Sequence, residues 1–151
     1  MQGSDLETKV CNVPSLSNHF VGIFSIDTLP KSIKNRTFLF SNTALRNEVG
    51  EHWICICKTD HGVELFDSLG LDSNKQNIYS KYCKFRNVKE LTINETQFQL
   101  STSTTCGLFV IYFVMQRFHN LDIAFKTLLK DIFTSENALN EEIVKAFYEE
   151  L

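Results

Sequence analysis

Residues 106–118 read CGLFVIYFVMQRF, and their apolar side chains would surround almost the whole circumference of a helix. A helix that is apolar on every side is expected to be buried. Its most apolar part, Leu108–Met115, is far shorter than the ~20 residues that a membrane-spanning helix needs. We therefore predict that this segment is a helix in the centre of a globular fold, with other elements packed around it.

Upstream of this segment, the chain has the residue patterns of β-strands. Residues 52–58 read HWICICK, in which both sets of alternating positions are largely apolar. A strand with two apolar faces is typical of the middle of a sheet that is covered on both sides. Further strands are predicted at residues 20–26, 37–42, 63–67 and 88–93. The expected fold class is α+β, with a mixed central sheet flanked by helices and the buried helix 106–118 against it.

The other segments are predicted to be helices, loops and an N-terminal arm. Residues 1–18 are polar and lack periodicity, which predicts an irregular arm and leaves residues 19–151 as a single domain. Loops are expected at residues 43–51, 68–73 and 94–105, and helices at residues 74–84, 122–133 and 136–151. In the last helix an apolar residue recurs every four positions, which predicts one apolar face: Leu139, Ile143, Phe147 and Leu151.

The composition is that of an ordinary globular domain. The chain has 151 residues, of which 43% are hydrophobic and 22% are charged, and its formal net charge is -3. No run of basic residues stands out, so the overall charge does not favour binding to nucleic acid. The cysteines are odd in number and follow no disulfide framework, which predicts reduced thiols in an intracellular setting.

Metal and cofactor sites are not expected from the sequence. Cys55 and Cys57 would point the same way from one strand, but no C-x-x-C pair and no second pair of ligands accompanies them, as a structural zinc site would require. No glycine-rich phosphate-binding loop or nucleotide fingerprint is present. We therefore predict neither a bound metal nor a cofactor.

Cys106 is the cysteine whose position is best suited to chemistry. It would be the first residue of the buried helix, where unpaired backbone N–H groups and the helix dipole favour a thiolate. Gly107, which follows it, is a poor residue for a helix interior but lets a substrate approach the backbone closely. The alternative is that Cys106 is simply a buried thiol, which is the commonest state of a cysteine in a core.

Three further residues could complete the site of a cysteine peptidase, which needs a base, a group that orients the base, and donors for an oxyanion. His52 begins the central strand and would be the base, and Asp67 ends the neighbouring strand, where its carboxylate could orient the imidazole. Gln99 lies in the loop before the cysteine and could donate to an oxyanion, although Gln97 is equally available. Each of these residues could instead have only a structural role.

Together with their surroundings, these residues resemble the adenovirus-type cysteine endopeptidases (adenains). Residues 20–24, FVGIF, with the following Leu29-Pro30, look like the first strand and turn of that family, and residues 42–53, NTALRNEVGEHW, are similar to its Asn-Thr-Ala segment leading to Gly-x-His-Trp. Residues 65–70, LFDSLG, resemble its Leu-Phe-Glu-Pro-Phe-Gly, and residues 106–109, CGLF, are the same string as its nucleophile turn. The resemblance covers roughly residues 20–118, about two-thirds of the chain.

This resemblance implies an adenain-like fold and a set of site residues. Cys106 would be the nucleophile and His52 the base. Asp67 would be the orienting acid in the place of the family's Glu, and Gln99 would be the oxyanion donor. Trp53 would line a narrow substrate channel that admits small residues, often Gly, next to the cut. An aspartate at the orienting position is also used by proteases of ubiquitin-like modifiers, which belong to the same wider clan.

The resemblance also implies a substrate and a place of action. Related peptidases occur in viruses, in virophages and in transposons of the Maverick/Polinton kind. The expected substrate is therefore a viral or element-encoded precursor of a capsid or core protein, cleaved by a monomeric enzyme in the host cytoplasm or nucleus and in the virion, with no membrane partner. Two alternatives remain: an isopeptidase or processing protease for ubiquitin-like modifiers, and a catalytically inactive binding module.

An activating partner is not supported. Adenoviral enzymes are activated by DNA and by a short peptide that forms a disulfide with an enzyme cysteine. Counted back from Cys106, that cysteine would fall at Val88, and Cys83 is several residues away. The acidic balance of the chain also weakens the case for activation by DNA. The sequence therefore supports neither a peptide activator nor a nucleic-acid activator.

Overall fold

The structure, a computed structural model, describes residues 1–47 and 52–151 as an α+β fold built on a mixed sheet. The strands lie side by side in chain order: β1 (Phe20–Ser25), β2 (Thr37–Asn42), β3 (Trp53–Thr59), β4 (Gly62–Phe66) and β5 (Leu91–Ile93). The two outer pairings are parallel and the two central pairings are antiparallel. The predicted mixed sheet flanked by helices is confirmed. The last strand begins at Leu91 rather than at Val88, and the predicted loop at 43–51 lies in part outside the described residues.

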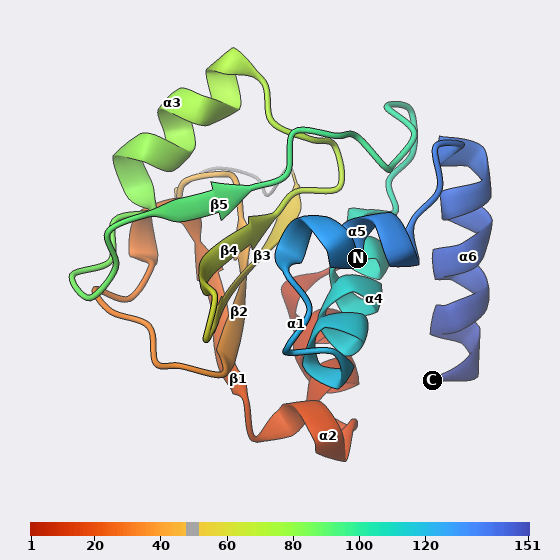
Figure 1. The fold of residues 1–151 in the computed structure, drawn as a ribbon, viewed down its shortest axis with the longest axis horizontal. Coiled ribbons are helices and arrows are strands. Elements are labelled where there is room, and N and C mark those ends of the chain that lie inside the picture. The colour runs from red at the N-terminus through yellow and green to blue at the C-terminus, as the bar shows by residue number, and fades with distance from the viewer. Residues whose placement is uncertain (48–51) are drawn as a thin grey trace.

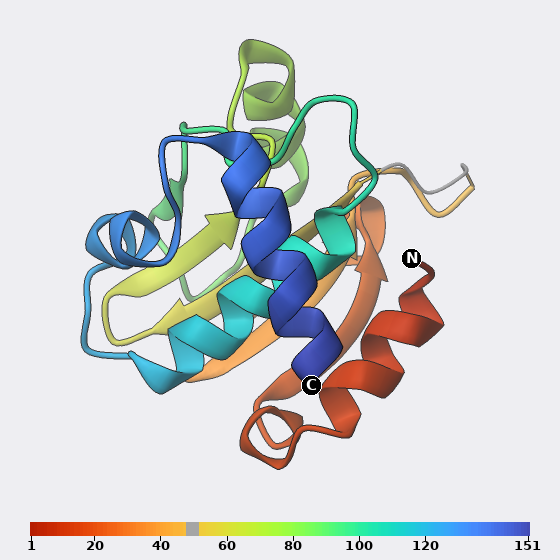
Figure 2. The same cartoon turned by 90° about the vertical axis from the view of Figure 1, so that its right-hand side faces the viewer.

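Helices cover both faces of the sheet (Figure 1). They are α1 (Gly3–Cys11), α2 (Pro14–Ser17), α3 (Ser73–Tyr82), α4 (Cys106–His119), α5 (Phe125–Ile132) and α6 (Asn137–Glu150), with a short 3₁₀ turn, η1 (Ile26–Thr28). Figure 2 shows α6 crossing the outer side of α4, which itself packs against the sheet. Among the described residues, no helix combines the length and the apolar character needed to cross a membrane.

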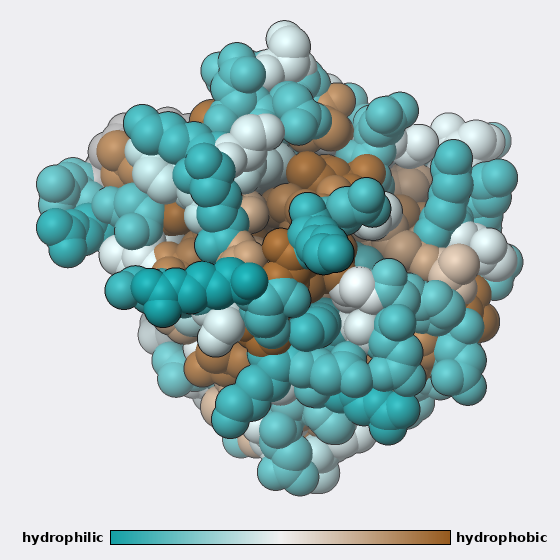
Figure 3. All heavy atoms as spheres, turned by 60° about the vertical axis from the view of Figure 1, so that its left-hand side comes forward, coloured by the Kyte–Doolittle hydropathy of each residue, from teal (hydrophilic) through white to brown (hydrophobic). Residues whose placement is uncertain are grey.

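The central strand β3 divides the core into two clusters. Cys55 and Cys57 face the cluster that contains α4, whereas Ile54 and Ile56 face the cluster that contains Tyr79 of α3. All four β3 side chains are fully buried, so the predicted burial of both faces of this strand is confirmed. On the face drawn in Figure 3, hydrophobic residues reach the surface in patches near the middle, between hydrophilic ones.

The predicted irregular arm at residues 1–18 is wrong, because these residues form α1 and α2. Leu6 and Val10, one helical turn apart, and Leu16 are fully buried in the same cluster as α4. The backbone N–H of Gln2 donates to the Asp5 carboxylate at the start of α1. This hydrogen bond caps the N-terminus of the helix. Three apolar positions among polar residues are too few to reveal a helix from sequence, but they are enough to attach it.

The apolar face predicted for the last helix is wrong in part. In α6, Leu139 is 40% exposed and Leu151, just beyond its end, is 38% exposed. The buried residues of this helix are instead Asn140, Glu141 and Val144. Two of these three are polar, so this helix meets the rest of the protein partly through hydrogen bonds.

A stack of aromatic rings connects the end of β4, the loop before α4, and α4 itself. The Phe66 and Phe113 rings are stacked with centroids 4.5 Å apart, and the Phe98 and Phe133 rings are stacked at the same distance. Phe66 also stacks on Phe133 at 5.7 Å, which joins the two pairs. Such pairs each contribute about 0.5–1.5 kcal/mol beyond the burial of their area. Phe66 and Phe98 directly precede Asp67 and Gln99, so the stack supports two of the candidate site residues.

Candidate active site

Cys106 is the first residue of α4, as predicted from its sequence. The first N–H groups of a helix have no partner within it, and the positive end of the dipole lies there. The backbone N–H of Trp53 points at the Cys106 Sγ at 3.5 Å. Cys106 is partly exposed, whereas Cys55, Cys57 and Cys83 are buried. Of these thiols, Cys106 is therefore the one placed where an anion is stabilised and a substrate can reach it.

His52 lies between Cys106 and Asp67. Its Nε2 is 2.7 Å from Asp67 Oδ1, and its ring also hydrogen-bonds the Cys106 thiol. Because Nε2 is engaged by the carboxylate, Nδ1 is the nitrogen left for the sulfur. The His52 side chain is 10% exposed and that of Asp67 is fully buried. Three residues predicted from separate segments of the sequence thus form one connected row.

Asp67 is held from four directions. Its Oδ1 accepts from His52 and from the backbone N–H of Leu69 at 2.9 Å. Its Oδ2 accepts from the Tyr79 hydroxyl at 2.7 Å and from the Lys75 ammonium at 3.2 Å. Each oxygen of a buried carboxylate therefore has two donors. This arrangement keeps the carboxylate ionised and fixes the direction in which it meets the imidazole.

The backbone around Asp67 is held by the loop that leads to α4. The Asn94 side chain both accepts from the Asp67 N–H at 2.9 Å and donates to the Asp67 carbonyl at 2.7 Å. Gly70 has a φ of +78°, and a Cβ there would lie 2.5 Å from the carbonyl oxygen of Glu95. The two loops approach each other so closely that only glycine fits at this position. These contacts therefore join Asp67 to the loop that carries Gln99.

The electrostatics favour a thiolate–imidazolium pair. Burial alone would lower the pKa of His52, but its hydrogen bonds to Asp67 and Cys106 outweigh burial and raise that pKa to about 9. Burial alone would raise the pKa of Cys106, but the hydrogen bonds from His52 and from the Trp53 N–H lower it below the usual thiol value. Burial opposes ionisation of Asp67 too, yet its bond to His52 and the charges of His52 and Lys75 hold its pKa low. The proton is therefore favoured on His52 rather than on the thiol.

Gln99 is buried in the wall of the cleft beside Cys106. Its Oε1 accepts from the Ser68 hydroxyl at 2.5 Å, and its Nε2 donates to the Ser103 carbonyl at 3.1 Å and the Ser103 hydroxyl at 3.0 Å. Gln97, the alternative, donates instead to the Gln99 carbonyl and the Ser101 hydroxyl and does not line the cleft. Gln99 is thus the better placed of the two amides, with Ser103 occupying its donors.

The cleft has a cavity volume of about 770 Å³. Trp53 lines it, and its indole Nε1 donates to the carbonyl of Met1 at 3.0 Å. Gly107 is buried and does not line the cleft, because the Met1 side chain covers it: a Cβ on Gly107 would lie 2.9 Å from Met1 Sδ. The N-terminal residues thus form one wall beside Cys106, in the space where Trp53 and Gly107 were expected to contact a substrate.

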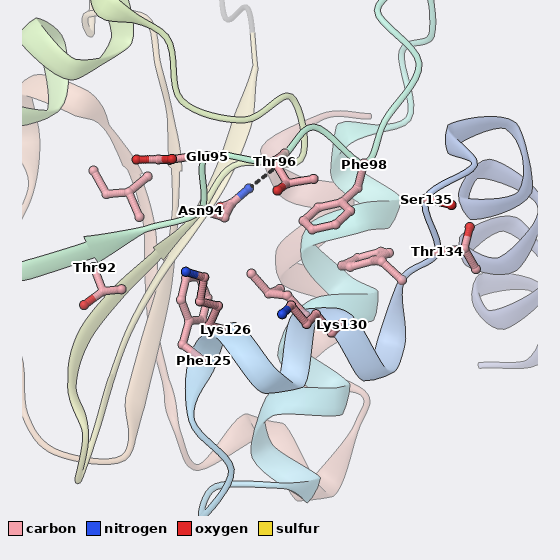
Figure 4. A pocket seen from close by; sticks show the side chains of 13 residues that line it. Thr92, Asn94, Glu95, Thr96, Phe98, Phe125, Lys126, Lys130, Thr134 and Ser135 are labelled. Carbon is pink, nitrogen blue, oxygen red and sulfur yellow. Dashed lines mark hydrogen bonds between the residues drawn. The ribbon is translucent and has the colours of Figure 1, made fainter.

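A second cavity of about 540 Å³ opens between β5 and α5 (Figure 4). Phe98 and Phe133 line it, and Lys126 and Lys130 extend towards it from α5. Its described lining contains neither cysteine nor histidine. The Cys106 thiol and the His52 imidazole line the first cavity instead.

Several residues that complete the site were missed by sequence reasoning. Ser68 follows Asp67 directly, and this adjacency is the only signal that could have singled it out. The others carry no local sequence pattern that would single them out: Lys75, Tyr79, Asn94, Ser103 and Glu141. The other histidines lie outside this row: His61 and His119 are exposed, and His19 contacts the carbonyl of Arg36.

We expect iodoacetamide to alkylate Cys106 at pH 7 at least tenfold faster than the exposed Cys11, because only a thiolate attacks the reagent and the pKa of Cys106 is lowered. Burial raises the pKa of Cys55 and Cys57 well above the usual value, so these thiols should react last. Mass spectrometry of timed digests gives the rate at each cysteine. Equal rates at Cys106 and Cys11 would contradict the ion pair.

Comparison with known proteins adds no family assignment, since neither a protein-family model nor a curated protein matches the chain. Inferences about its activity therefore rest on the arrangement of these side chains.

Proposed function

We propose that this protein is a cysteine peptidase with Cys106 as nucleophile. The observation that carries the proposal is the row Cys106–His52–Asp67, with the thiol at the N-terminus of α4 and the carboxylate fully buried behind the imidazole. A cysteine with only a structural role would need neither a base nor an oriented carboxylate beside it. The resemblance of residues 20–118 to adenain-like endopeptidases agrees with these roles and suggests the same fold.

The proposed reaction runs through an acyl-enzyme. The Cys106 thiolate forms a bond to the carbonyl carbon of the scissile peptide, and the carbonyl electrons move to oxygen. The backbone N–H of Cys106 and the Gln99 amide would donate to this oxyanion, with Gln99 releasing one of its bonds to Ser103. His52 gives its proton to the leaving amine as the C–N bond breaks. Water, deprotonated by His52, then hydrolyses the thioester and restores the thiolate.

The proposed substrate is a viral or element-encoded precursor protein cut next to small residues. Trp53 and the Met1 side chain narrow the cleft beside Cys106, which favours glycine or another small residue at the cut. A library of peptides with defined cleavage positions tests this preference directly. Incubation with capsid precursors and, separately, with a ubiquitin-like precursor separates maturation of particles from processing of modifiers. Cleavage of neither protein nor any peptide would overturn the proposal.

Hydrolysis is expected to have a bell-shaped pH profile. Activity should appear at a pH below the usual thiol pKa, because the pKa of Cys106 is lowered, and should be lost as the pH rises through about 9, where His52 loses its proton. Alkylation of Cys106 needs no proton donor, so its rate should not fall on the alkaline side. Parallel measurements of kcat/KM and of alkylation between pH 5 and 10 check both limbs. A profile that kept rising above pH 10 would contradict the role of His52 as proton donor.

A further inference from the structure

The following inference rests on the proposed function and concerns α6, the last helix. Two consecutive buried residues of this helix hold the backbone on either side of Gln99. The Asn140 amide donates to the Phe98 carbonyl at 3.2 Å, and the Leu100 N–H donates to the Glu141 carboxylate at 3.1 Å. Asn140 is fully buried and Glu141 is 4% exposed. The backbone N–H groups of Phe98 and Gln99 also donate to the Ser68 carbonyl. The position of Gln99 along the cleft therefore depends on Ser68 and on a helix that itself contributes nothing to the cleft lining.

Glu141 also reaches the side chain of Gln99 through one intermediate. Its Oε2 accepts from the Ser103 hydroxyl at 3.0 Å, and its Oε1 accepts from the Thr105 hydroxyl at 2.5 Å. Ser103 Oγ in turn accepts from Gln99 Nε2 at 3.0 Å. Because a carboxylate can only accept, the Ser103 proton is directed to Glu141 and an oxygen lone pair is left facing Gln99. The same carboxylate holds Thr105, the residue directly before the nucleophile.

We propose that Glu141 is a positioning residue for oxyanion stabilisation: through Ser103 and Leu100 it holds the Gln99 amide beside the Cys106 thiol. Its partners are donors on the loop 99–105, and it makes no hydrogen bond with Cys106, His52 or Asp67, so its effect is expected to be mainly on the loop. The mutual orientation of these last three residues is set by contacts with Trp53 at the start of β3, Asn94 after β5 and Tyr79 of α3. The Glu141 contacts thus support the oxyanion part of the site, whereas the residues that form the thiolate have further contacts of their own from Trp53 and Tyr79.

Glu141→Gln tests this division of roles, because the side chain keeps its shape but one acceptor oxygen becomes a donor. Leu100 and Ser103 both donate to Oε2, and Thr105 donates to Oε1, so either orientation of the new amide places N–H against a donor. The matched control is Glu142→Gln, at the exposed neighbouring position of the same helix. The control removes the same charge without touching the loop.

The two assays separate the two parts of the site. Peptide hydrolysis develops an oxyanion, whereas alkylation of Cys106 by iodoacetamide occurs at a saturated carbon and develops none. Displacing a catalytic group by about 1 Å costs on the order of 10²-fold. We therefore expect Glu141→Gln to lower kcat for peptide hydrolysis by roughly 10- to 100-fold, with KM and the alkylation rate within about twofold of the wild type. Glu142→Gln should change none of the three.

The double variant Gln99→Ala/Glu141→Gln tests whether Glu141 acts through Gln99. Gln99→Ala alone should lower kcat by on the order of 10²–10³-fold, as expected for loss of one oxyanion donor. Adding Glu141→Gln to it should cost less than threefold more, because the group that Glu141 positions is already absent. Ser103→Ala removes only the hydroxyl that links Glu141 to Gln99, so it tests the same link by a second substitution. It should lower kcat and leave the alkylation rate of Cys106 unchanged.

The outcomes are distinct. A wild-type protein that hydrolyses no peptide contradicts the proposed peptidase itself and not the role of Glu141. Active wild type with unchanged kcat in both Glu141→Gln and Ser103→Ala overturns the positioning role. Equal losses of hydrolysis and alkylation, or fully multiplicative losses in the double variant, also overturn it, because they indicate a general disturbance of the fold. If Glu141→Gln does not yield folded protein, the Ser103→Ala result decides in the same way.

Discussion

Replacing Cys106 by Ala is expected to abolish peptide hydrolysis while leaving the fold intact. In a serine protease, removing the nucleophile costs on the order of 10⁶-fold in kcat, and no other described thiol lies in this cleft to replace Cys106. The substitution removes a partly exposed sulfur and no buried ring or aliphatic group, so the melting temperature should change by less than about 3 °C. Hydrolysis of the best library peptide and a thermal melt of the same sample measure both effects.

Cys11→Ala is the matched control for this experiment, because Cys11 is exposed and does not line the cleft. Its activity should equal that of the wild type. Activity retained in Cys106→Ala would end the assignment of the nucleophile. Loss of activity together with a large fall in melting temperature would leave Cys106→Ser to separate chemistry from folding, since the hydroxyl keeps the shape of the thiol.

Replacing Asp67 by Asn is expected to lower kcat by on the order of 10³–10⁴-fold. Oδ1 accepts from His52 and Leu69, and Oδ2 accepts from Tyr79 and Lys75. The new NH₂ group would therefore face donors in either orientation. If it turned towards His52, the imidazole would be forced into the tautomer that cannot take a proton from the sulfur. The charge that raises the pKa of His52 would also be lost.

The same substitution should lower the alkylation rate of Cys106, since a less basic His52 stabilises the thiolate less well. This distinguishes Asp67→Asn from Glu141→Gln, which should leave alkylation unchanged. Asp72→Asn is the matched control: Asp72 caps the N-terminus of α3, and Asn is an equally good cap. A kcat for Asp67→Asn within tenfold of the wild type would show that the carboxylate is structural only.

The parts of the fold that could be predicted are those with a local period. The two apolar faces of β3 and the apolar circumference of α4 are visible in a few consecutive residues, and both elements lie within one residue of the expected bounds. His52 directly precedes β3 and Asp67 directly follows β4, rather than lying in these strands as expected. His52 and Asp67 could be placed together because β3 and β4 pair as antiparallel neighbours, which brings the start of one strand to the end of the next. Pairing of adjacent strands needs only local information.

The parts that could not be predicted depend on contacts between distant segments. The hydrogen bond from the Leu100 N–H to Glu141 joins residues 41 positions apart, and the sequence near either residue contains no pattern that predicts it. A glutamate between apolar residues of a helix suggests a solvated face, so Leu139 was expected to be buried and Glu141 to be exposed. In the structure Glu141 is buried and Leu139 is exposed. Likewise, α1 is attached by Leu6 and Val10, whose burial becomes evident only once α4 is in place.

The aromatic stack also limits how such a protein can diverge over generations. Phe66 and Phe98 are the chain neighbours of Asp67 and Gln99, and Phe113 lies on the helix that begins with Cys106. A lineage that gains or loses ring volume at one of these positions shifts a candidate site residue as well as the core. Surviving changes should therefore come in compensating sets, so that size at positions 66, 98, 113 and 133 covaries among active descendants, while the exposed residues of α3 and α6 drift freely.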